Sequence, residues 1–319
     1  MKLSRGRSLA LVRIHYLATP MLLHETFIEE TFAEAFRMWY ARLIVTALDE
    51  EALDAAVREV TGFAASVIAC DVEAGLEQTL APADTPDGRV GAAVMFFGYS
   101  ADVLAKSVPT RVGQCVMTCP TTAVYDGLPE AETRLVLGNH LRFFGDGFQK
   151  SKRIGERHYW RIPVMDGEFV VEATAGAAKG IGGGSLIIEA RTQRAALLSA
   201  RRAAAAVAKV PGVIAPFPGG LVRSGSKVGS RYKALRASTN DAWCPTLRGR
   251  VESQLHPETE CAYELVFDGV DEQAIRSAMH HAAHAAAGAD ILRLSAANFG
   301  GNLGKFKFHL REVVEIERA

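Results

Sequence analysis

The stretch Gly184-Ser-Leu-Ile-Ile-Glu-Ala-Arg191 is a short apolar run of the kind that forms a buried strand. An alanine-rich segment from about Thr192 to Lys209 follows it and predicts a helix, which the Pro-Gly pair at 211–212 ends. Val213–Ala215 then begins a second strand, and this strand runs into the loop Phe217-Pro-Gly-Gly220. The segment therefore predicts a strand–helix–strand unit that ends in an aromatic residue and two glycines.

The same pattern occurs again near the C-terminus. Cys261–Asp268 predicts a strand, and Asp271 opens a helix that Gly288 ends. Ile291–Ser295 forms the next strand and runs into Asn298-Phe-Gly-Gly301. Two such units in succession predict a β-α-β-β-α-β lobe, in which an antiparallel sheet carries both helices on one face.

The N-terminal half has the same order of elements. We predict strands at Ala41–Ala47, Ser66–Cys70, Val90–Phe97 and Gln114–Thr118, and helices at Asp49–Val60 and Ala101–Val112. The repeated order predicts an α+β fold of two ferredoxin-like lobes that arose by internal duplication. We place the join near His158–Asp166, which gives an N-terminal lobe at residues 25–160 and a C-terminal lobe at residues 161–319.

The composition favours a protein of the cytoplasm. The chain has 319 residues, of which 49% are hydrophobic, and a chain of this length can support two cores. Its 36 basic residues balance its 36 acidic residues, so no global charge points to nucleic acid or to a membrane surface. The five cysteines are odd in number and mostly lie within apolar runs, which suits reduced thiols better than a disulfide framework.

Residues 1–24 differ from the rest of the chain. They include Lys2, Arg5, Arg7 and Arg13 but no acidic residue. No small-residue cleavage site follows them cleanly, which argues against a targeting peptide. We expect a dispensable extension, with Met21 as the natural start.

The segment Phe217–Arg250 has a local excess of positive charge. It contains seven basic residues and one acid, Asp241, together with many glycines and serines. Backbone N–H groups and cations in one loop are suited to an anionic ligand. Because a long loop inside a compact domain is usually functional or disordered, and Phe217 and Trp243 favour order, we expect a binding loop.

Two glycine-rich stretches resemble nucleotide-binding motifs without matching them. In Gly220–Lys227 the serine precedes the lysine, whereas phosphate and magnesium binding need Gly-Lys-Ser/Thr. Gly180–Ser185 precedes a predicted strand instead of following one, so it lacks the helix N-terminus that would hold a pyrophosphate. A tight turn, or a place where the backbone comes close to a ligand, is the better interpretation of Gly180–Ser185.

Possible metal ligands are also better explained in other ways. His280 and His284 are four residues apart on a predicted helix, but no third ligand is evident and we expect them to face solvent. Cys115 and Cys119 lie at the end of a predicted strand without further ligands at a matching spacing, so we interpret them as structural.

Glu264 is the acidic residue with the most suggestive position. Alternation along Cys261–Asp268 places it on the same strand face as Ala262 and Val266. A carboxyl between two apolar side chains can be desolvated, which raises its pKa toward that of a general acid. Periodicity alone leaves a solvated sheet face as an open alternative.

Ten motifs of this sequence resemble the formylmethanofuran:tetrahydromethanopterin formyltransferase family, in its bacterial, methylotroph type. The matching stretches are Glu29–Phe36, Thr61–Cys70, Thr85–Arg89, Arg111–Thr118, Phe143–Gly147, Pro216–Gly220, Ser224–Ser230, Ala237–Asn240, Cys261–Glu264 and Asn298–Gly301. The resemblance extends over about residues 21–312. It implies a homo-oligomer, either a dimer or a tetramer, with active sites in clefts shared between subunits.

The resemblance also implies the chemistry. The family transfers a formyl group between N5 of tetrahydromethanopterin and the amine of methanofuran, both of them substrates, with no bound cofactor and no metal. Its proposed catalytic acid aligns with Glu264. The matching loops make the following residues candidates for substrate binding: Gly219, Gly220, Ser224, Ser226, Lys227, Asn298, Gly300 and Gly301.

The bacterial type further implies a place in formaldehyde oxidation to formate. There the formyl group passes from the pterin to the furan carrier, and a hydrolase partner in a larger complex releases formate. A non-catalytic subunit that only positions formyl carriers for such a hydrolase remains the alternative.

Overall fold

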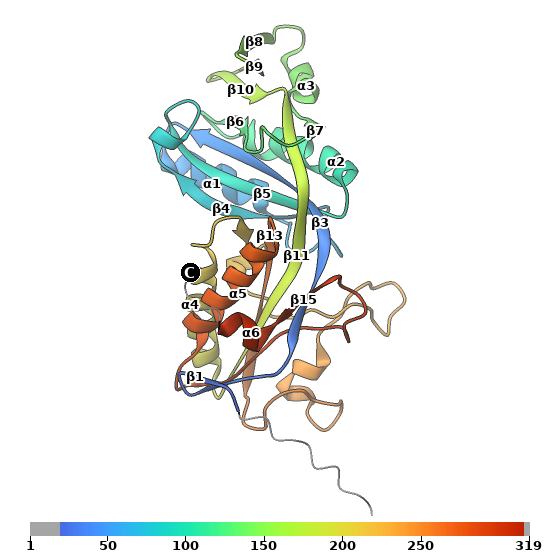
Figure 1. The fold of residues 1–319 in the computed structure, drawn as a ribbon. Helices are drawn as coiled ribbons and strands as arrows, with labels where there is room; N and C mark the ends of the chain where they lie inside the picture. The colour runs from blue at the N-terminus through green and yellow to red at the C-terminus, as the bar shows by residue number, and fades with distance from the viewer. Residues whose placement is uncertain (1–19, 316–319) are drawn as a thin grey trace, which may run out of the picture.

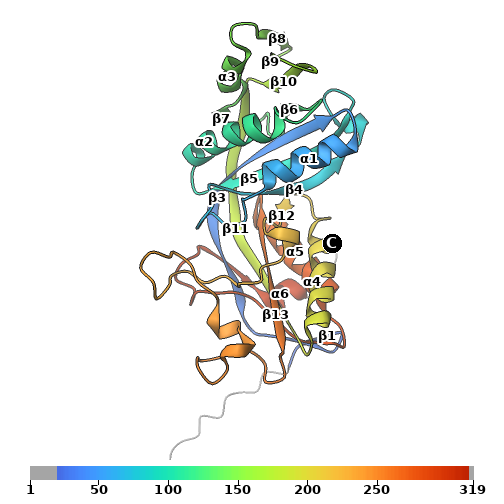
Figure 2. The ribbon, with the colours of Figure 1, turned by 180° about the vertical axis from the view of Figure 1, so that it is seen from behind.

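The computed structural model describes residues 20–315. In Figures 1 and 2 the chain forms an elongated molecule of two lobes, with the strands of residues 150–172 at one end. Residues 1–19 of the predicted extension lie outside the described residues. Leu22 and Leu23, which we counted with that extension, form strand β1 and pair with Phe27 and Thr26.

The chain order and bounds of the elements are as follows. The first half contains β1 (Leu22–Leu23), β2 (Thr26–Ile28), β3 (Phe32–Ala47), α1 (Glu50–Thr61), β4 (Glu73–Leu80), β5 (Val90–Gly98), α2 (Ala101–Arg111), β6 (Ala123–Asp126), β7 (Thr133–Val136), α3 (Gly138–Leu141), β8 (Lys150–Ile154), β9 (Arg157–Val164) and β10 (Gly167–Glu172). The second half contains β11 (Thr174–Ala190), α4 (Gln193–Val207), β12 (Val213–Ile214), β13 (Cys261–Gly269), α5 (Glu272–Ala286), β14 (Ile291–Ser295), β15 (Phe306–His309) and α6 (Leu310–Val314).

The duplication is visible in the strand order of the two lobes. In the N-terminal lobe the strands lie in the order β4, β5, β3, β6, and in the C-terminal lobe in the order β12, β13, β11, β14. Both sequences of elements are β-α-β-β-α-β with the same spatial arrangement, so the predicted pair of ferredoxin-like lobes is confirmed. Side-chain caps begin the four main helices, and they come from Asp49, Ser100, Thr192 and Asp271.

Two long strands join the lobes into one sheet. Strands β3 and β11 pair antiparallel from Ala177 opposite Ala41 to Gly182 opposite Phe36. In Figure 1 both strands run along the length of the molecule through both lobes. As a result Ala33 and Ala35 of β3, which we placed in the N-terminal lobe, pack in the core of the C-terminal lobe.

Two predicted strands of the N-terminal lobe are wrong. Residues 66–70 form turns, and the second strand of this lobe is β4. Residues 112–116 form a π-helical continuation of α2, so the last strand of the lobe is β6. The six predicted elements of the C-terminal lobe are present, and the bounds of five differ by a few residues; the first strand, predicted at Gly184–Arg191, begins ten residues earlier at Thr174.

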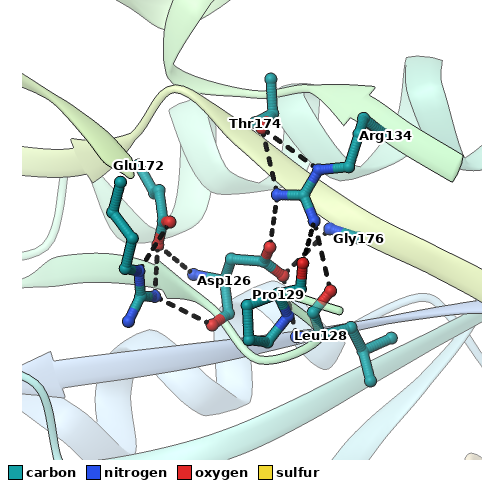
Figure 3. Close-up of polar contacts among 8 residues, drawn as sticks. Asp126, Leu128, Pro129, Arg134, Glu172, Thr174 and Gly176 are labelled. Atoms are coloured by element: carbon teal, nitrogen blue, oxygen red, sulfur yellow. Dashed lines mark hydrogen bonds and ion pairs between the residues drawn. The ribbon is translucent and has the colours of Figure 1, made fainter. Parts of the chain in front are cut away.

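A network of ion pairs between two buried carboxylates and two partly exposed arginines anchors the turn after β6 to β11 (Figure 3). Asp126 accepts hydrogen bonds from the backbone N–H groups of Leu128 (2.8 Å) and Gly176 (2.9 Å), and it pairs with Arg134. Glu172 accepts the N–H of Asp126 at 2.9 Å and pairs with Arg157 at 2.6 Å. The network fixes the beginning of β11, where this strand pairs with β7.

Helices α4 and α5 cover one face of the C-terminal sheet, while the long segment between β12 and β13 lies on the other side (Figure 2). Small buried side chains such as Ala200 and Ala282 let the two helices pack closely. None of the helices within residues 20–315 is both long and apolar enough to cross a membrane.

Candidate active site

A cavity of about 670 Å³ lies between the first part of β3, the N-terminal lobe and the loop that precedes β13. Its walls are formed by Glu34, Phe36, Met38, residues 66–69, Glu73, Tyr99, Gly182, Gly183, Ser185, Phe217, residues 224–228, residues 236–238, Glu264, Val266, Ala297, Phe299 and Leu303. The volume is within the range of small-molecule sites, about 300–1,000 Å³.

Glu264 is held on the floor of this cavity by hydrogen bonds on both sides of its strand. On one side it lies opposite Ile187 of β11. On the other side it forms an isolated bridge with Val222, in which the two residues exchange backbone hydrogen bonds of 2.7 Å and 3.2 Å. The predicted alternation is confirmed. Of the two possibilities left open, a solvated sheet face and a desolvated carboxyl, the second is correct, because Glu264 is only 3% exposed.

The two carboxyl oxygens of Glu264 differ in their environment. Oε2 accepts the backbone N–H of Ser226 at 2.6 Å. Oε1 is buried and has no hydrogen-bond partner among residues 20–315. Burial raises the pKa of Glu264 to about 7, and the hydrogen bonds from Ser226 oppose that rise only in part. At neutral pH a large share of the molecules therefore carries a neutral Glu264 that can donate a proton.

The glycine- and serine-rich loop is ordered around this carboxyl. Val228 and Ala237 form a bridge, and the N–H of Gly229 donates to the carbonyl of Arg236 at 2.8 Å, so residues 227–238 form a small hairpin. The side-chain amide of Asn240 donates to the carbonyl of Ser226 at 3.0 Å. These bonds fix the backbone N–H that binds Glu264.

Lys227 does not act as a phosphate-binding lysine. Its ammonium group pairs with Asp241 at 2.5 Å, and a hairpin follows it where a P-loop needs a helix. The tip of the hairpin instead presents three exposed basic residues, Arg231, Lys233 and Arg236, and Arg236 also lines the cavity.

The predicted binding residues fall into two groups. Ser224, Ser226 and Lys227 line the cavity together with Glu264. Gly219, Gly220, Asn298, Gly300 and Gly301 are not among the residues that line it. Gly220 instead packs near Ala204 of α4, and its N–H donates to Phe217.

The loop Asn298–Gly304 directs its backbone N–H groups at a buried carboxylate that the sequence analysis missed. Glu34 accepts hydrogen bonds from the N–H groups of Phe299 (2.8 Å), Gly301 (2.9 Å), Leu303 and Gly304. Burial alone would raise the pKa of Glu34, but these four donors hold it below its usual value. Glu34 is thus an anion that shapes the loop, and Ala297, Phe299 and Leu303 are the residues of this loop that reach the cavity.

The sequence analysis also missed a pair of neighbouring buried acids, Glu73 and Asp268. Glu73, at the start of β4, lines the cavity, and its carboxyl is close enough to that of Asp268 for its charge to help raise the Asp268 pKa. Burial is the main cause that raises the pKa of both groups. The signal in the sequence was the alternation of β13, which puts Asp268 on the same face as Glu264.

The other motifs have structural explanations. Gly180–Ser185 lies inside β11, so the prediction that it precedes the strand is wrong. A register shift occurs between Ile181 and Gly184, and a Cβ on Gly182 would lie 2.1 Å from the sulfur of Met38, so Gly182 packs tightly against that side chain. Cys115 and Cys119 lie at and beyond the π-helical turn, not on a strand.

The histidines of α5 differ in exposure. His281 is exposed. The expectation that His280 and His284 face solvent is wrong, because both are only partly exposed and their ring nitrogens lie 3.1 Å from the carbonyls of Val313 and Val314. Within residues 20–315 no group of three or more histidine, cysteine or acidic side chains is arranged to hold a metal ion.

The fold and the site define a two-lobed α+β protein whose cavity is lined by a buried carboxyl with a raised pKa, as suits proton donation to a bound organic substrate. Comparison with known families narrows this class. The model of the formylmethanofuran–tetrahydromethanopterin formyltransferase family matches residues 21–164, and the model of its proximal lobe matches residues 167–313. The chain belongs to the formylmethanofuran–tetrahydromethanopterin formyltransferase family.

Individual relatives agree over nearly their whole length. The formylmethanofuran–tetrahydromethanopterin formyltransferase of Methylococcus capsulatus is 52% identical, over 92% of this chain and 100% of its own. The crystal structure of the formyltransferase/hydrolase complex of Methylorubrum extorquens with methylofuran contains a chain 44% identical to this one. It matches with a TM-score of 0.89, over 93% of this chain and 99% of its own. The Methanosarcina barkeri enzyme structure is 41% identical, with a TM-score of 0.88, over 92% of this chain and 100% of its own.

Proposed function

We propose that this protein transfers a formyl group from N5 of tetrahydromethanopterin to the amine of methanofuran or a bacterial analogue. The observation that carries the proposal is the position of Glu264, a buried carboxyl with one unpartnered oxygen on the floor of the cavity. The family and the relatives support the pair of carriers.

The reaction needs no covalent bond to the protein. The neutral amine attacks the formyl carbon, and the carbonyl electrons move to oxygen, which gives a tetrahedral oxyanion. A protonated Glu264 donates a hydrogen bond to this oxygen, where the negative charge develops. The bond between carbon and N5 then breaks, N5 takes up a proton and the attacking nitrogen loses one, so that the formyl group ends on the furan carrier.

The rigid support of Glu264 suits this role. Its backbone is bonded to two neighbouring segments and its Oε2 to the N–H of Ser226, so Oε1 is the oxygen free to meet the substrate. A donor that is held in place before the reaction stabilises the oxyanion without reorganisation. Positioning both carriers in one cavity can lower the activation free energy by a further ~7–11 kcal/mol.

The exposed basic hairpin is the proposed contact for the acidic parts of the carriers. Tetrahydromethanopterin and the furan carrier both bear acidic groups. Arg236 lines the cavity, and Arg231 and Lys233 are exposed on the same hairpin. Ser224, Ser226 and Lys227 are the other residues we assign to substrate binding, because they line the cavity. The other five predicted binding residues do not line the cavity, and we propose that they shape the loops around it: Gly219, Gly220, Asn298, Gly300 and Gly301.

The proposal extends to the setting of the reaction. The Methylorubrum relative is part of a formyltransferase/hydrolase complex, and we propose the same kind of partner here, in a cytoplasmic pathway from formaldehyde to formate. We also propose a homo-oligomer, as the family resemblance implies.

The test is formyl exchange by the purified chain. Formyl-tetrahydromethanopterin is mixed with the furan carrier, and the product is followed by absorbance and mass spectrometry. Turnover by the chain alone supports a transferase. Binding of both carriers without turnover would overturn it in favour of a subunit that only positions carriers for a hydrolase.

A further inference from the structure

Glu73 and Asp268 form a carboxyl pair that the reaction described above does not use. Asp268 is fully buried and Glu73 is 7% exposed. Glu73 Oε1 accepts the N–H of Val67 at 3.0 Å, and Asp268 Oδ1 accepts the N–H of Gly183 at 3.1 Å. Oδ2 of Asp268 is buried without a hydrogen-bond partner among residues 20–315, and the neighbouring charge of Glu73 adds to burial in raising the pKa of Asp268.

This pair lacks the neutralising cation that buried acids usually have. Among the ion pairs within residues 20–315, none includes Glu73 or Asp268, whereas the buried Glu77 pairs with Arg42 at 2.6 Å. A buried carboxyl without a cation is unfavourable for folding. Such a group in the wall of a cavity is a candidate for ligand recognition.

The position of the pair sets which part of a substrate it can meet. Glu264 and Asp268 are four residues apart on one face of β13, or about 13 Å at 3.3 Å per residue. Glu73 lies against Asp268 and lines the same cavity as Glu264. If Glu264 is at the reacting formyl group, Glu73 meets a part of the substrate well away from that group.

The wall near Glu73 suits a flat ring. Met38, Val67, Tyr99 and Val266 line the cavity together with Glu73. Burial is the main cause that raises the pKa of Tyr99, and the charge of Glu73 is the second. The phenol of Tyr99 is therefore neutral next to Glu73. A flat ring that packs against these apolar and aromatic side chains can reach the carboxyl of Glu73, which lines the same cavity.

We propose that Glu73, supported by Asp268, binds the pyrimidinone edge of the pterin through its 2-amino group and N3–H. Two adjacent N–H donors match the two oxygens of a carboxylate. The far end of the furan carrier bears carboxylates, which an acidic pair would repel, so charge assigns this end of the cavity to the pterin. The inference rests on the proposed formyl transfer, and it makes Glu73 a specificity-determining residue.

The test measures binding separately from turnover. Affinity for tetrahydromethanopterin alone is measured by calorimetry for the wild type, Glu73→Gln and, as a matched surface control, the exposed Glu51→Gln. We expect Glu73→Gln to weaken pterin binding by about 10- to 100-fold and to leave the affinity for the furan carrier unchanged. The control Glu51→Gln should bind both carriers as the wild type does. Pterin affinity within twofold of wild type in Glu73→Gln, or an equal loss for both carriers, would overturn the proposal.

A second measurement needs no variant. 6-Methyltetrahydropterin and its 2-desamino analogue compete with tetrahydromethanopterin for the wild-type protein. The analogue is expected to compete at least tenfold less well, and equal competition would also overturn the role of Glu73. A wild-type protein that binds the pterin in this selective way but does not transfer formyl would refute the proposed function and leave the binding role intact.

Discussion

The backbone N–H of Ser226 donates a 2.6 Å hydrogen bond to Oε2 of Glu264, across 38 positions of the chain. The donor belongs to the loop between β12 and β13, and the acceptor to β13 itself. The bond joins the basic loop to the buried acid, so a change in the loop can alter the orientation and the pKa of Glu264. The candidate site therefore depends on the basic loop as well as on Glu264.

The pH dependence of activity follows from the pKa of Glu264. Burial raises that pKa to about 7, and only the protonated form can donate to the oxyanion. For rates corrected for the share of the amine that is neutral, we expect kcat to be level below about pH 6.5 and to fall about tenfold per pH unit above the pKa. Stopped-flow rates between pH 5.5 and 9 check this, and a corrected rate that rises through this range would contradict a protonated donor.

The same raised pKa affects stability. A native pKa of about 7 against 4.5 for the ordinary group means that the stabilising contribution is complete below about pH 4.5 and is lost as the pH rises through 7. A glutamine does not titrate. Relative to wild type, Glu264→Gln should therefore gain about 2 to 3 kcal/mol in free energy of unfolding between pH 5 and pH 8.

Urea unfolding of both proteins at several pH values measures this difference. Other buried acids, including Glu73 and Asp268, affect both proteins alike, so their contributions cancel. A difference that does not change with pH would mean that Glu264 ionises as an ordinary carboxyl.

The basic hairpin should act on binding and not on the chemical step. Replacing Arg231 and Lys233 by alanine removes two exposed charges at the tip. We expect KM for the carriers to rise about 3- to 10-fold at low salt and the effect to shrink near 0.5 M salt, with kcat unchanged. The control is Arg191→Ala, which removes an exposed charge that pairs with Glu258 and does not line the cavity. A salt-independent effect would argue against charge attraction.

The contact between Gly176 and the turn after β6 sets the fit of the long strand β11. A Cβ on Gly176 would lie 2.1 Å from the carbonyl oxygen of Leu128, and the N–H of Gly176 is held by Asp126. We expect Gly176→Ala to lower the free energy of unfolding by about 3 kcal/mol or more. Gly288→Ala, where a Cβ would meet nothing within 4 Å, should change it by less than about 1 kcal/mol. Equal stability of the two variants would show that the turn can move away.

The C-terminal lobe could be predicted from the sequence because its signals agree with one another. Thr192 and Asp271 cap the two helices, and Pro211 and Gly288 follow the helix ends, so each strand is clearly bounded. The position of Glu264 on the buried face followed from alternation. Its degree of burial did not, since the loop that covers it comes from another part of the chain.

The N-terminal lobe was harder because acids occupy buried positions. Strand β4 carries Glu73 and Glu77, which are buried against Asp268 and Arg42, so its pattern does not look apolar. The neighbouring segment Ser66–Cys70 does look apolar, yet it forms turns that line the cavity. The role of Glu34 was not visible either, because its four donors lie more than 260 positions away.

The central claim is that Glu264 is the acid of formyl transfer, and the kinetics of Glu264→Gln test it most directly. Purified wild-type and variant chains are compared in formyl exchange between tetrahydromethanopterin and the furan carrier at pH 6.5. We predict a kcat lower by roughly 10²–10⁴, with KM for both carriers little changed, because the lost interaction is made in the transition state. A variant with near-wild-type kcat would contradict the claim and remove Glu264 from the mechanism.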